Sequence, residues 1–518
     1  MSRPPGVQPK IDISNEAPEI GPRPATGGGK KSRTPLRLLF SLAGFGIIIL
    51  IGFLLHYRWL QTAECPDSDA AIVVLMARHF AHGDFTPYFW GQRYMGALEP
   101  LLLTPFNLLR PATAGDAACL ALMITIAQAL VCVSSVGALR GSPWLTCLVY
   151  AVPSSMVGFL HSRLYGARLV ASLLCLCAFR LLIARPSRRK AGVAGALFGV
   201  ALWADHLMIG WASGLWLLLR HRGRQTITTF VLAVLPMLVF DVAAMVAGSG
   251  NTSNPREPWH WLSNLALLLH TGLPTLLGVE WVSPLANTPK ATAGWVCASA
   301  LAAVVVMLLG SLVARRGDSQ GGEREARPIG ALLMVVLSFC LLYVLGAVDY
   351  QSTRYLEPAL GPLSILLGIA AARLRYTTRP LAVLLVAPAI YSSLAGRSVT
   401  KVSDAQQCLV EARQVKESFV RQGVQGAWCF YWDCYRLALL TDEVVPFAPY
   451  RGEDRRKSWT EAVLRAEPVA YVVRSDDSEA HRATASALAK PIHRETIGSL
   501  ELIVMPSSLK EFPHRRGR

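Results

Sequence analysis

An acidic pair, Asp67 and Asp69, follows the first apolar run of the chain and precedes the amphipathic stretch AAIVVLMARHF. A carboxylate that faces a cavity can accept a proton from an acceptor hydroxyl, or help to hold a metal ion. The alternative is structural: Asp67 or Ser68 caps a helix, and Asp69 lies near the positive end of that helix. The two interpretations are compatible, because a helix start holds a carboxylate in place. We expect Asp69 to be the catalytic residue, as a general base or as a metal ligand.

The run GQRYMGALEP, later in the same loop, supplies neutral hydrogen-bonding groups and a further carboxylate: Gln92, Tyr94 and Glu99. Amides and hydroxyls beside aromatic rings are typical of sites that bind a sugar. We therefore expect these three residues and Asp67 to contact a sugar or its acceptor. The alternative is an interfacial aromatic belt, with Trp90 and Tyr94 at the level of the lipid headgroups.

Cationic side chains fall at the expected outer ends of apolar runs: Arg163 and Arg168 in HSRLYGAR, His206 in WADH, and Arg354 in DYQSTRY. A charge within a helical bundle is costly, and by default it indicates function. Arginine binds phosphate oxygens in a bidentate manner. We expect these residues, with the adjacent Tyr355, to bind the headgroup of a polyprenyl phosphate. Two alternatives stay open: each cation alone anchors its helix by snorkelling, or Asp349 pairs with Arg354.

The composition indicates a polytopic membrane protein. The chain has 518 residues, of which 52% are hydrophobic and 16% are charged; soluble proteins carry about a quarter charged residues. The net charge of +17 raises the question of a nucleic-acid partner. However, most Lys and Arg residues stand in short clusters between apolar runs, where they orient membrane spans. No nucleic-acid partner is expected.

Apolar runs predict about eleven transmembrane helices, each needing roughly 20 residues. The runs lie at 36–55, 115–138, 143–160, 165–184, 191–204, 207–219, 226–247, 292–314, 329–347, 355–372 and 380–396. The two short runs around WADH are expected to be helices that meet at a polar turn. Residues 97–110 contain Pro100 and Pro105, which favours a short broken helix in the membrane interface over a further span.

Basic clusters predict the topology, because they concentrate on the cytoplasmic side. With a disordered basic cytoplasmic tail at 1–36, every strongly basic loop falls inside. The transmembrane domain then spans 37–396, and its first outer loop is 57–114. Residues 397–518 carry more charge and strand-like segments such as AYVVR, which indicates a small extracytoplasmic α/β domain. The expected location is the bacterial plasma (inner) membrane, with the N-terminus cytoplasmic.

Cysteine placement gives little evidence for a metal site. Seven of the eleven cysteines lie in apolar runs, where they are small packing residues, and none of the others has zinc-ligand spacing. Cys429 and Cys434 flank FYWD, and a disulfide between them is possible if that side is oxidising. The sequence leaves this open.

Several motifs together resemble the GT-C superfamily of polytopic glycosyltransferases. These are PDSDAA around Asp69, GDFTPYFWGQRYMGALEP, RYLEP from Arg354, and YWDCYRL followed by AYVV. More narrowly, the chain resembles bacterial family-39-like proteins related to protein mannosyltransferases and aminoarabinose transferases. The resemblance implies a polytopic α-helical fold and an inverting transfer of a sugar from a polyprenyl-phosphate donor. The acceptor, a glycan, lipid or protein, would be modified at the outer face of the membrane.

The same resemblance carries the role of base or metal ligand onto Asp69. Relatives commonly show Asp-Glu where this chain has Asp69-Ala70. This leaves open whether Asp67 or Glu99 is the second carboxylate, whether one is needed, and whether a divalent metal takes part. A transporter or flippase of lipid-linked sugars is the main alternative, but the inverted repeats expected of one are not seen. The second alternative is a non-catalytic protein of the same fold.

Overall fold

The computed structural model describes residues 52, 54, 56–92, 95–151, 153, 155–183, 187–247, 261–277, 320–346, 350–373, 402–451, 454–474 and 491–508. The expected tail at 1–36, most of the first apolar run and the runs at 292–314 and 380–396 lie outside these residues. Tyr94 and Asp349 lie outside them as well.

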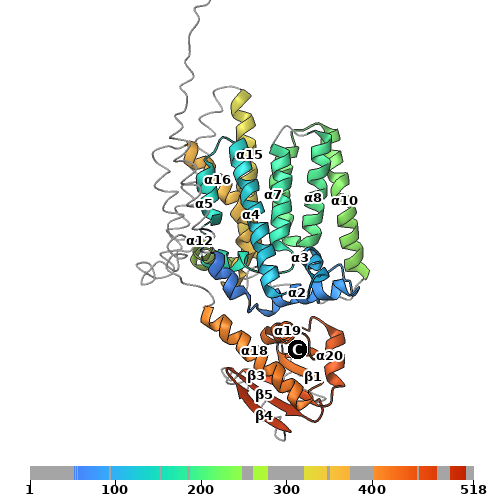
Figure 1. The fold of residues 1–518 in the computed structure, drawn as a ribbon. Coiled ribbons are helices and arrows are strands. Elements are labelled where there is room, and N and C mark those ends of the chain that lie inside the picture. The colour runs from blue at the N-terminus through green and yellow to red at the C-terminus, as the bar shows by residue number, and fades with distance from the viewer. Residues whose placement is uncertain are drawn as a thin grey trace, which may run out of the picture. The chain divides into compact units, whose positions relative to one another are not determined.

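The chain up to residue 373 is helical in its described parts (Figure 1). The α-helices are α2 (Ser68–Ala81), α3 (Leu98–Leu103), α4 (Ala114–Ala138), α5 (Pro143–Ala151), α6 (Ser155–His161), α7 (Arg168–Ile183), α8 (Arg188–Ala204), α9 (Ala212–Leu219), α10 (Arg224–Ala247), α11 (Trp261–Leu267), α12 (Leu273–Leu277), α15 (Gln320–Gly346) and α16 (Leu360–Arg373). Short 3-10 or π turns complete them: η1 (Thr104–Leu108), η2 (His206–Trp211), η4 (Leu268–Gly272) and η6 (Tyr350–Ala359).

Four described helical stretches are long and apolar enough to cross a membrane: Ala114–Ala138, Arg224–Ala243, Ala326–Gly346 and Arg354–Ala372. They coincide closely with runs predicted from the sequence. The prediction of one continuous helix at 143–160 is wrong, because α5 and α6 lie on either side of Pro153. Proline removes a backbone donor and clashes with the preceding turn, which explains the break. The total of about eleven spans stays a prediction.

Small residues allow close packing within the bundle, where α4, α7, α8 and α10 lie side by side in Figure 1. At Gly195 of α8, an added Cβ atom would lie 2.4 Å from the Phe230 carbonyl oxygen of α10. Glycine at such positions lets the two backbones approach, as is common between helices in membranes.

The WADH segment forms the expected polar turn. Helix α8 ends at Ala204, and Asp205 caps η2 by accepting a hydrogen bond from the Leu207 N–H at 2.9 Å. The N–H of Gly96, in the segment between α2 and α3, lies 3.0 Å from the carbonyl oxygens of both Trp203 and Ala204. A Cβ atom at Gly96 would be 2.7 Å from the Trp203 ring. The loop is therefore held against the end of α8.

Residues 97–110 form two short helices, α3 and η1, and Pro105 lies in the first turn of η1. Proline is tolerated at a helix start, where its missing N–H has no partner to lose. A short broken helix is thus what the structure shows, and its position in the membrane interface stays a prediction.

The C-terminal segment, residues 402–508, alternates helices and strands, as the sequence indicated. Its elements are α18 (Val402–Gln422), β1 (Gly426–Phe430), α19 (Tyr431–Leu440), β2 (Phe447–Arg451), α20 (Lys457–Leu464), β3 (Val469–Arg474), β4 (His493–Ile497) and β5 (Leu500–Met505). They build one five-stranded sheet of order β2-β1-β3-β5-β4. Strand β1 pairs in parallel with β2 and β3, whereas β5 pairs antiparallel with β3 and β4. The central strands are buried, which explains their apolar sequences.

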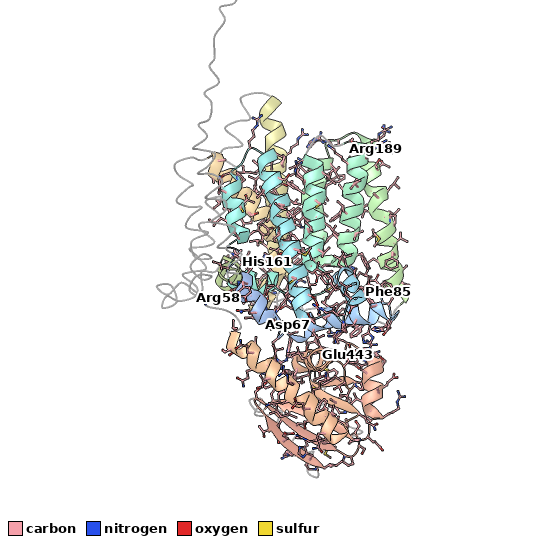
Figure 2. All side chains as sticks on the ribbon, in the orientation of Figure 1. Arg58, Asp67, Phe85, His161, Arg189 and Glu443 are labelled. Atoms are coloured by element: carbon pink, nitrogen blue, oxygen red, sulfur yellow. A yellow bond between two sulfur atoms is a disulfide. The ribbon has the colours of Figure 1, made fainter. Side chains whose placement is uncertain are left out.

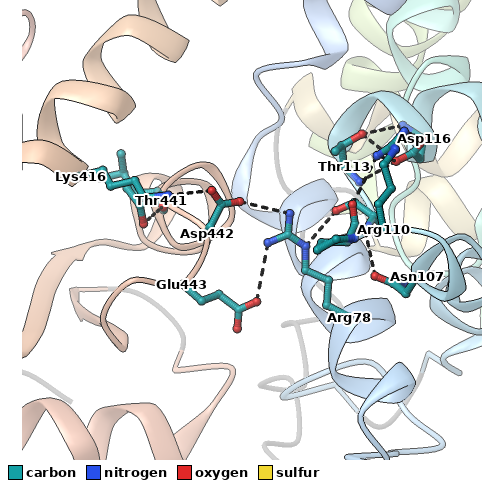
Figure 3. A network of polar contacts seen from close by, with 12 residues as sticks. Arg78, Asn107, Arg110, Thr113, Asp116, Lys416, Thr441, Asp442 and Glu443 are labelled. Atoms are coloured by element: carbon teal, nitrogen blue, oxygen red, sulfur yellow. Dashed lines mark hydrogen bonds and ion pairs between the residues drawn. The ribbon is translucent and has the colours of Figure 1, made fainter.

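Helix α19 packs against α2, and charged residues surround this contact (Figure 3). On α2, Arg78 donates from Nε to the Ala112 carbonyl oxygen at 2.9 Å. Its guanidinium nitrogens lie 3.6 Å from Asp442 and 3.9 Å from Glu443. Lys416 of α18 pairs with Asp442 at 2.8 Å. These pairs are partly exposed, so they orient the contact more than they stabilise it.

A second contact is aromatic and lies between the start of α20 and the segment that joins α2 to α3. The Arg456 guanidinium lies 4.3 Å from the centre of the Trp90 ring and 5.0 Å from that of Trp459. Arg456 also donates to Asp84 at 2.7 Å. Cation–π contacts of this kind contribute about 0.5–2 kcal/mol each, depending on burial. The C-terminal segment is therefore fixed to the segment that follows α2, the helix that contains Asp69.

Candidate active site at Asp69

The candidate site begins at the first turn of α2, where Asp67 is the N-cap (Figure 2). Its Oδ1 accepts a hydrogen bond from the Ala70 N–H at 2.9 Å, and its Oδ2 accepts one from the Tyr165 hydroxyl at 2.8 Å. Burial and the nearby Asp69 raise the pKa of Asp67. Asp69 lies in the first turn, where the helix dipole favours a carboxylate, and its side chain is 13% exposed. Asp67 therefore caps the helix, whereas the half-buried Asp69 is not used as a cap.

Two donors from distant parts of the chain meet at Asp69. Arg354, in η6, donates from Nη1 to Oδ2 at 3.3 Å. The hydroxyl of Tyr431, the first residue of α19, donates to Oδ1 at 2.5 Å. Burial raises the pKa of Tyr431, with a further contribution from the Asp69 charge, so its hydroxyl stays protonated and can donate. Asp69 thus lies where the helical part of the chain meets the C-terminal segment.

A second cation lies beside Arg354, and the two share one aromatic ring. Arg168, at the start of α7, donates from Nε to Asp205 Oδ2 at 3.0 Å and from Nη1 to the Arg354 carbonyl oxygen at 3.3 Å. The guanidinium groups of Arg168 and Arg354 lie 5.0 and 5.5 Å from the centre of the Tyr355 ring. Arg168, Arg354 and Tyr355 therefore form one cluster next to Asp69.

Arg163 and His206 have different surroundings. The buried Arg163 donates from Nη2 to the Thr62 carbonyl oxygen at 3.0 Å and stacks on the Phe159 ring at 4.0 Å. His206 pairs with Asp241 at 2.6 Å. The structure therefore groups Arg168 and Arg354 with Asp69, and places Arg163 and His206 in other contacts.

The predicted sugar-binding residues of GQRYMGALEP also make contacts outside the cluster around Asp69. Glu99 is fully buried and accepts a hydrogen bond from the Leu169 N–H, at the start of α7, at 3.2 Å. Burial raises its pKa to about 8. Gln92 lies half-buried in a turn, where its N–H donates to the Phe89 carbonyl oxygen at 2.9 Å. Tyr94 lies outside the described residues.

Sequence reasoning expected the C-terminal segment to cover the site or select the acceptor, but it did not single out Tyr431 as a contact of Asp69. Besides the bond from its hydroxyl to Asp69, Tyr431 accepts at its carbonyl oxygen a hydrogen bond from the Ser68 hydroxyl at 2.6 Å. Arg455 donates from Nε to the Tyr431 hydroxyl at 3.3 Å. Tyr431 directly follows a strand-like apolar run, and side chains at that edge of an α/β sheet often line sites. The position of Tyr431 directly after this run is the sequence signal that could have identified it. Asp205, in the polar turn beside His206, was also missed.

The cysteine pairing differs from the one considered. Cys65 is bonded to Cys408 of α18, and Cys429 and Cys434 are free and buried. The structure therefore answers the question that the sequence left open: Cys429 and Cys434 are not bonded to each other. Both lie inside the packed core of the C-terminal segment, where they act as small apolar residues.

A metal site is not apparent near Asp69. Within the described parts of the chain, no group of three or more His, Cys, Asp or Glu side chains is arranged to hold a metal ion. The Asp69 carboxylate accepts one hydrogen bond from the Arg354 guanidinium and one from the Tyr431 hydroxyl. Each carboxylate oxygen can accept more than one hydrogen bond, so Asp69 retains the capacity to bind a further hydroxyl. The arrangement is suited to proton transfer beside a bound anion.

Comparisons with known proteins identify the fold. No family model matches the chain, and no curated protein matches its sequence. The chain is similar to the crystal structure of ArnT from Cupriavidus metallidurans in the apo state, with a TM-score of 0.55 and 11% identity, over 89% of this chain and 98% of that one. The same ArnT bound to undecaprenyl phosphate aligns over the same shares with a TM-score of 0.51 and 11% identity. The chain therefore has the fold of ArnT, which agrees with the fold that the sequence resemblance implied.

Proposed function

We propose that the chain is an integral membrane glycosyltransferase, which transfers a sugar from a polyprenyl-phosphate donor to an acceptor at the outer face of the membrane. The observation that carries the proposal is the contact of Asp69 with Arg354, next to Arg168. A carboxylate that can accept a proton thus lies beside two guanidinium groups that can hold a phosphate. The structure of ArnT bound to undecaprenyl phosphate supports a donor of this class.

The chemical step follows from this arrangement. The acceptor hydroxyl oxygen forms a bond to the anomeric carbon of the sugar, from the face opposite the phosphate. The bond between that carbon and the phosphate oxygen breaks, and its electron pair leaves with the polyprenyl phosphate. The hydroxyl proton passes to Asp69, and Arg354 and Arg168 stabilise the departing phosphate charge. Attack from the opposite face inverts the configuration of the sugar.

The disulfide supports the proposed placement of this site outside the cytoplasm. Disulfides persist in oxidising compartments and are rare in the cytosol. The Cys65–Cys408 bond joins the loop that precedes Asp69 to α18. We propose that both lie on the outer side of a bacterial plasma membrane, with the N-terminus in the cytoplasm.

The test compares Asp69→Asn with the wild type in proteoliposomes that contain a panel of undecaprenyl-phosphate sugars. Release of undecaprenyl phosphate in the presence of membrane glycans is measured. Loss of a general base is expected to slow release about 10²–10⁴-fold, with binding of undecaprenyl phosphate retained. Glu64→Gln, five residues before Asp69 and exposed, is the matched control.

Each outcome separates the alternatives. Release at the wild-type rate by Asp69→Asn would exclude the general-base role. Movement of a lipid-linked sugar across the bilayer without cleavage would indicate a transporter. A wild-type protein that binds undecaprenyl phosphate but neither cleaves nor moves any donor would indicate a non-catalytic protein. Chelation with EDTA in the same assay tests whether Asp69 needs a divalent ion.

A further inference from the structure

A cavity of about 410 Å³ opens next to Asp67 and is not used in the proposed transfer step. Asp67 and Arg163 line it from the helical part of the chain, and Gln407, Arg436 and Arg474 line it from the C-terminal segment. Its volume lies within the range of sites that bind small molecules, about 300–1,000 Å³. The cavity is therefore large enough for a ligand.

The position of this cavity in the sheet also indicates a ligand site. The chain leaves β1 through α19 to β2 on one side, and then crosses through α20 to β3 on the other side of β1. In open α/β sheets, ligands bind at the carboxyl ends of the strands where the strand order reverses in this way. Arg474 is the last residue of β3, and Arg436 lies on the helix that directly follows β1. Both arginines therefore stand at the edge where a ligand is expected.

Arg163 in the lining keeps hydrogen-bonding capacity. It donates from Nη1 to the Ser162 hydroxyl at 3.1 Å and from Nη2 to the Thr62 carbonyl oxygen at 3.0 Å. Each of these nitrogens carries two hydrogens, so each can donate one further hydrogen bond to a ligand.

The charges of the cavity decide the class of ligand. Three guanidinium groups line it, and three carboxylates line it as well, from Asp67, Asp404 and Glu411. Arg436 and Arg474 both also pair with Asp433. An anion such as free phosphate would meet these carboxylates. A ligand without net charge, whose groups both donate and accept hydrogen bonds, fits better, and the hydroxyls of a saccharide have this property.

We propose that this cavity binds a saccharide unit of the acceptor, so that the acceptor is a glycan that enters from the aqueous side. The inference rests on the proposed function, because Asp69 lies two residues after Asp67 and is the base that would receive the proton. A saccharide held against Asp67 and Arg436 presents its neighbouring hydroxyls toward the start of α2. The C-terminal segment then selects the acceptor.

Binding is measured directly, without transfer, on the full chain in nanodiscs by saturation-transfer difference NMR. The probes are cellobiose, maltose, mannobiose and chitobiose, with inorganic phosphate as the charged probe and glycerol as an unspecific polyol. At least one disaccharide is expected to bind saturably and more tightly than glycerol or phosphate. Gln407→Trp fills the cavity from the exposed face of α18 and is expected to weaken this binding about tenfold or more.

Gln406→Trp is the matched control, because Gln406 is exposed on the same helix and does not line the cavity. Its binding should equal that of the wild type, and the Cys65–Cys408 bond should form in both variants, which shows that the segment is folded. Arg474→Gln, at a side chain that is 35% exposed, is the second test and should also weaken binding. The proposal fails if no disaccharide binds saturably, if phosphate binds instead, or if Gln407→Trp binds like its control.

Failure of this proposal is distinguishable from failure of the proposed function. Saccharide binding with no cleavage of any lipid-linked donor would leave the cavity as a glycan site and exclude the transferase role. Cleavage that depends on Asp69, without saccharide binding in the cavity, would keep the transferase and overturn this inference alone.

Discussion

Replacement of the buried Glu99 by Gln tests whether its carboxyl group is structural or catalytic. Burial raises the pKa of Glu99 from 4.5 to about 8. Between these two values the folded state holds a proton that the unfolded chain releases. The free energy of unfolding therefore falls as the pH rises through this window. Each unit of difference corresponds to about 1.4 kcal/mol, so at pH 7 the cost amounts to about 3 kcal/mol.

Glutamine never ionises, and its carbonyl oxygen can keep the bond from the Leu169 N–H. We therefore expect Glu99→Gln to gain stability relative to the wild type as the pH is raised from 4.5 to 7, by about 3 kcal/mol. The thermal midpoint in detergent, recorded over this pH range, measures the change. Glu64→Gln is the control, since Glu64 is exposed in the same loop and should follow the wild type.

Turnover of the lipid-linked donor separates the two roles. A carboxyl group that only caps α7 leaves Glu99→Gln active at a rate close to the wild type. If the variant instead loses activity as Asp69→Asn does, Glu99 is the second catalytic carboxylate and the structural reasoning is refuted. An unchanged dependence of the thermal midpoint on pH would show that Glu99 is ionised in the folded state.

Two further perturbations test the contacts made by the C-terminal segment. Tyr431→Phe removes one of the two hydrogen-bond donors to Asp69. We expect turnover of the lipid-linked sugar to fall about tenfold, with undecaprenyl phosphate binding unchanged. Trp432→Phe is the control and should retain activity; equal rates for both variants would exclude a role for the Tyr431 hydroxyl. Cys65→Ser frees its partner cysteine, which a membrane-impermeant maleimide should then label in intact spheroplasts without any reductant. Labelling that required lysis would place the segment in the cytoplasm.

The helical part of the fold could be read from the sequence because apolar length and proline placement are local signals. Runs at 115–138 and 226–247 became α4 and α10 within a few residues. The turn at WADH could be predicted because two apolar runs were too short to span. The break between α5 and α6 was missed, since Pro153 stands inside an apolar run whose overall length suited one span.

The candidate site was less predictable because its contacts join distant segments. Asp69 and Arg354 could be singled out as charges at the ends of apolar runs. The Tyr431 contact could not, because it depends on how a sheet built from later residues packs against α2. The pairing of Cys65 with Cys408 was missed for a related reason: spacing does not determine which cysteines bond.

The bond between Tyr431 and Asp69 has a consequence for the order in which the protein matures. Translation supplies Asp69 early, whereas its partner is made 362 residues later. The other donor, Arg354, is made 285 residues after Asp69, so the carboxylate first lacks both donors and then one of them. Until residue 408 is made, Cys65 also lacks its disulfide partner. The nascent chain is thus held incomplete until its final segment has emerged, folded and docked, and only the finished molecule carries the assembled centre.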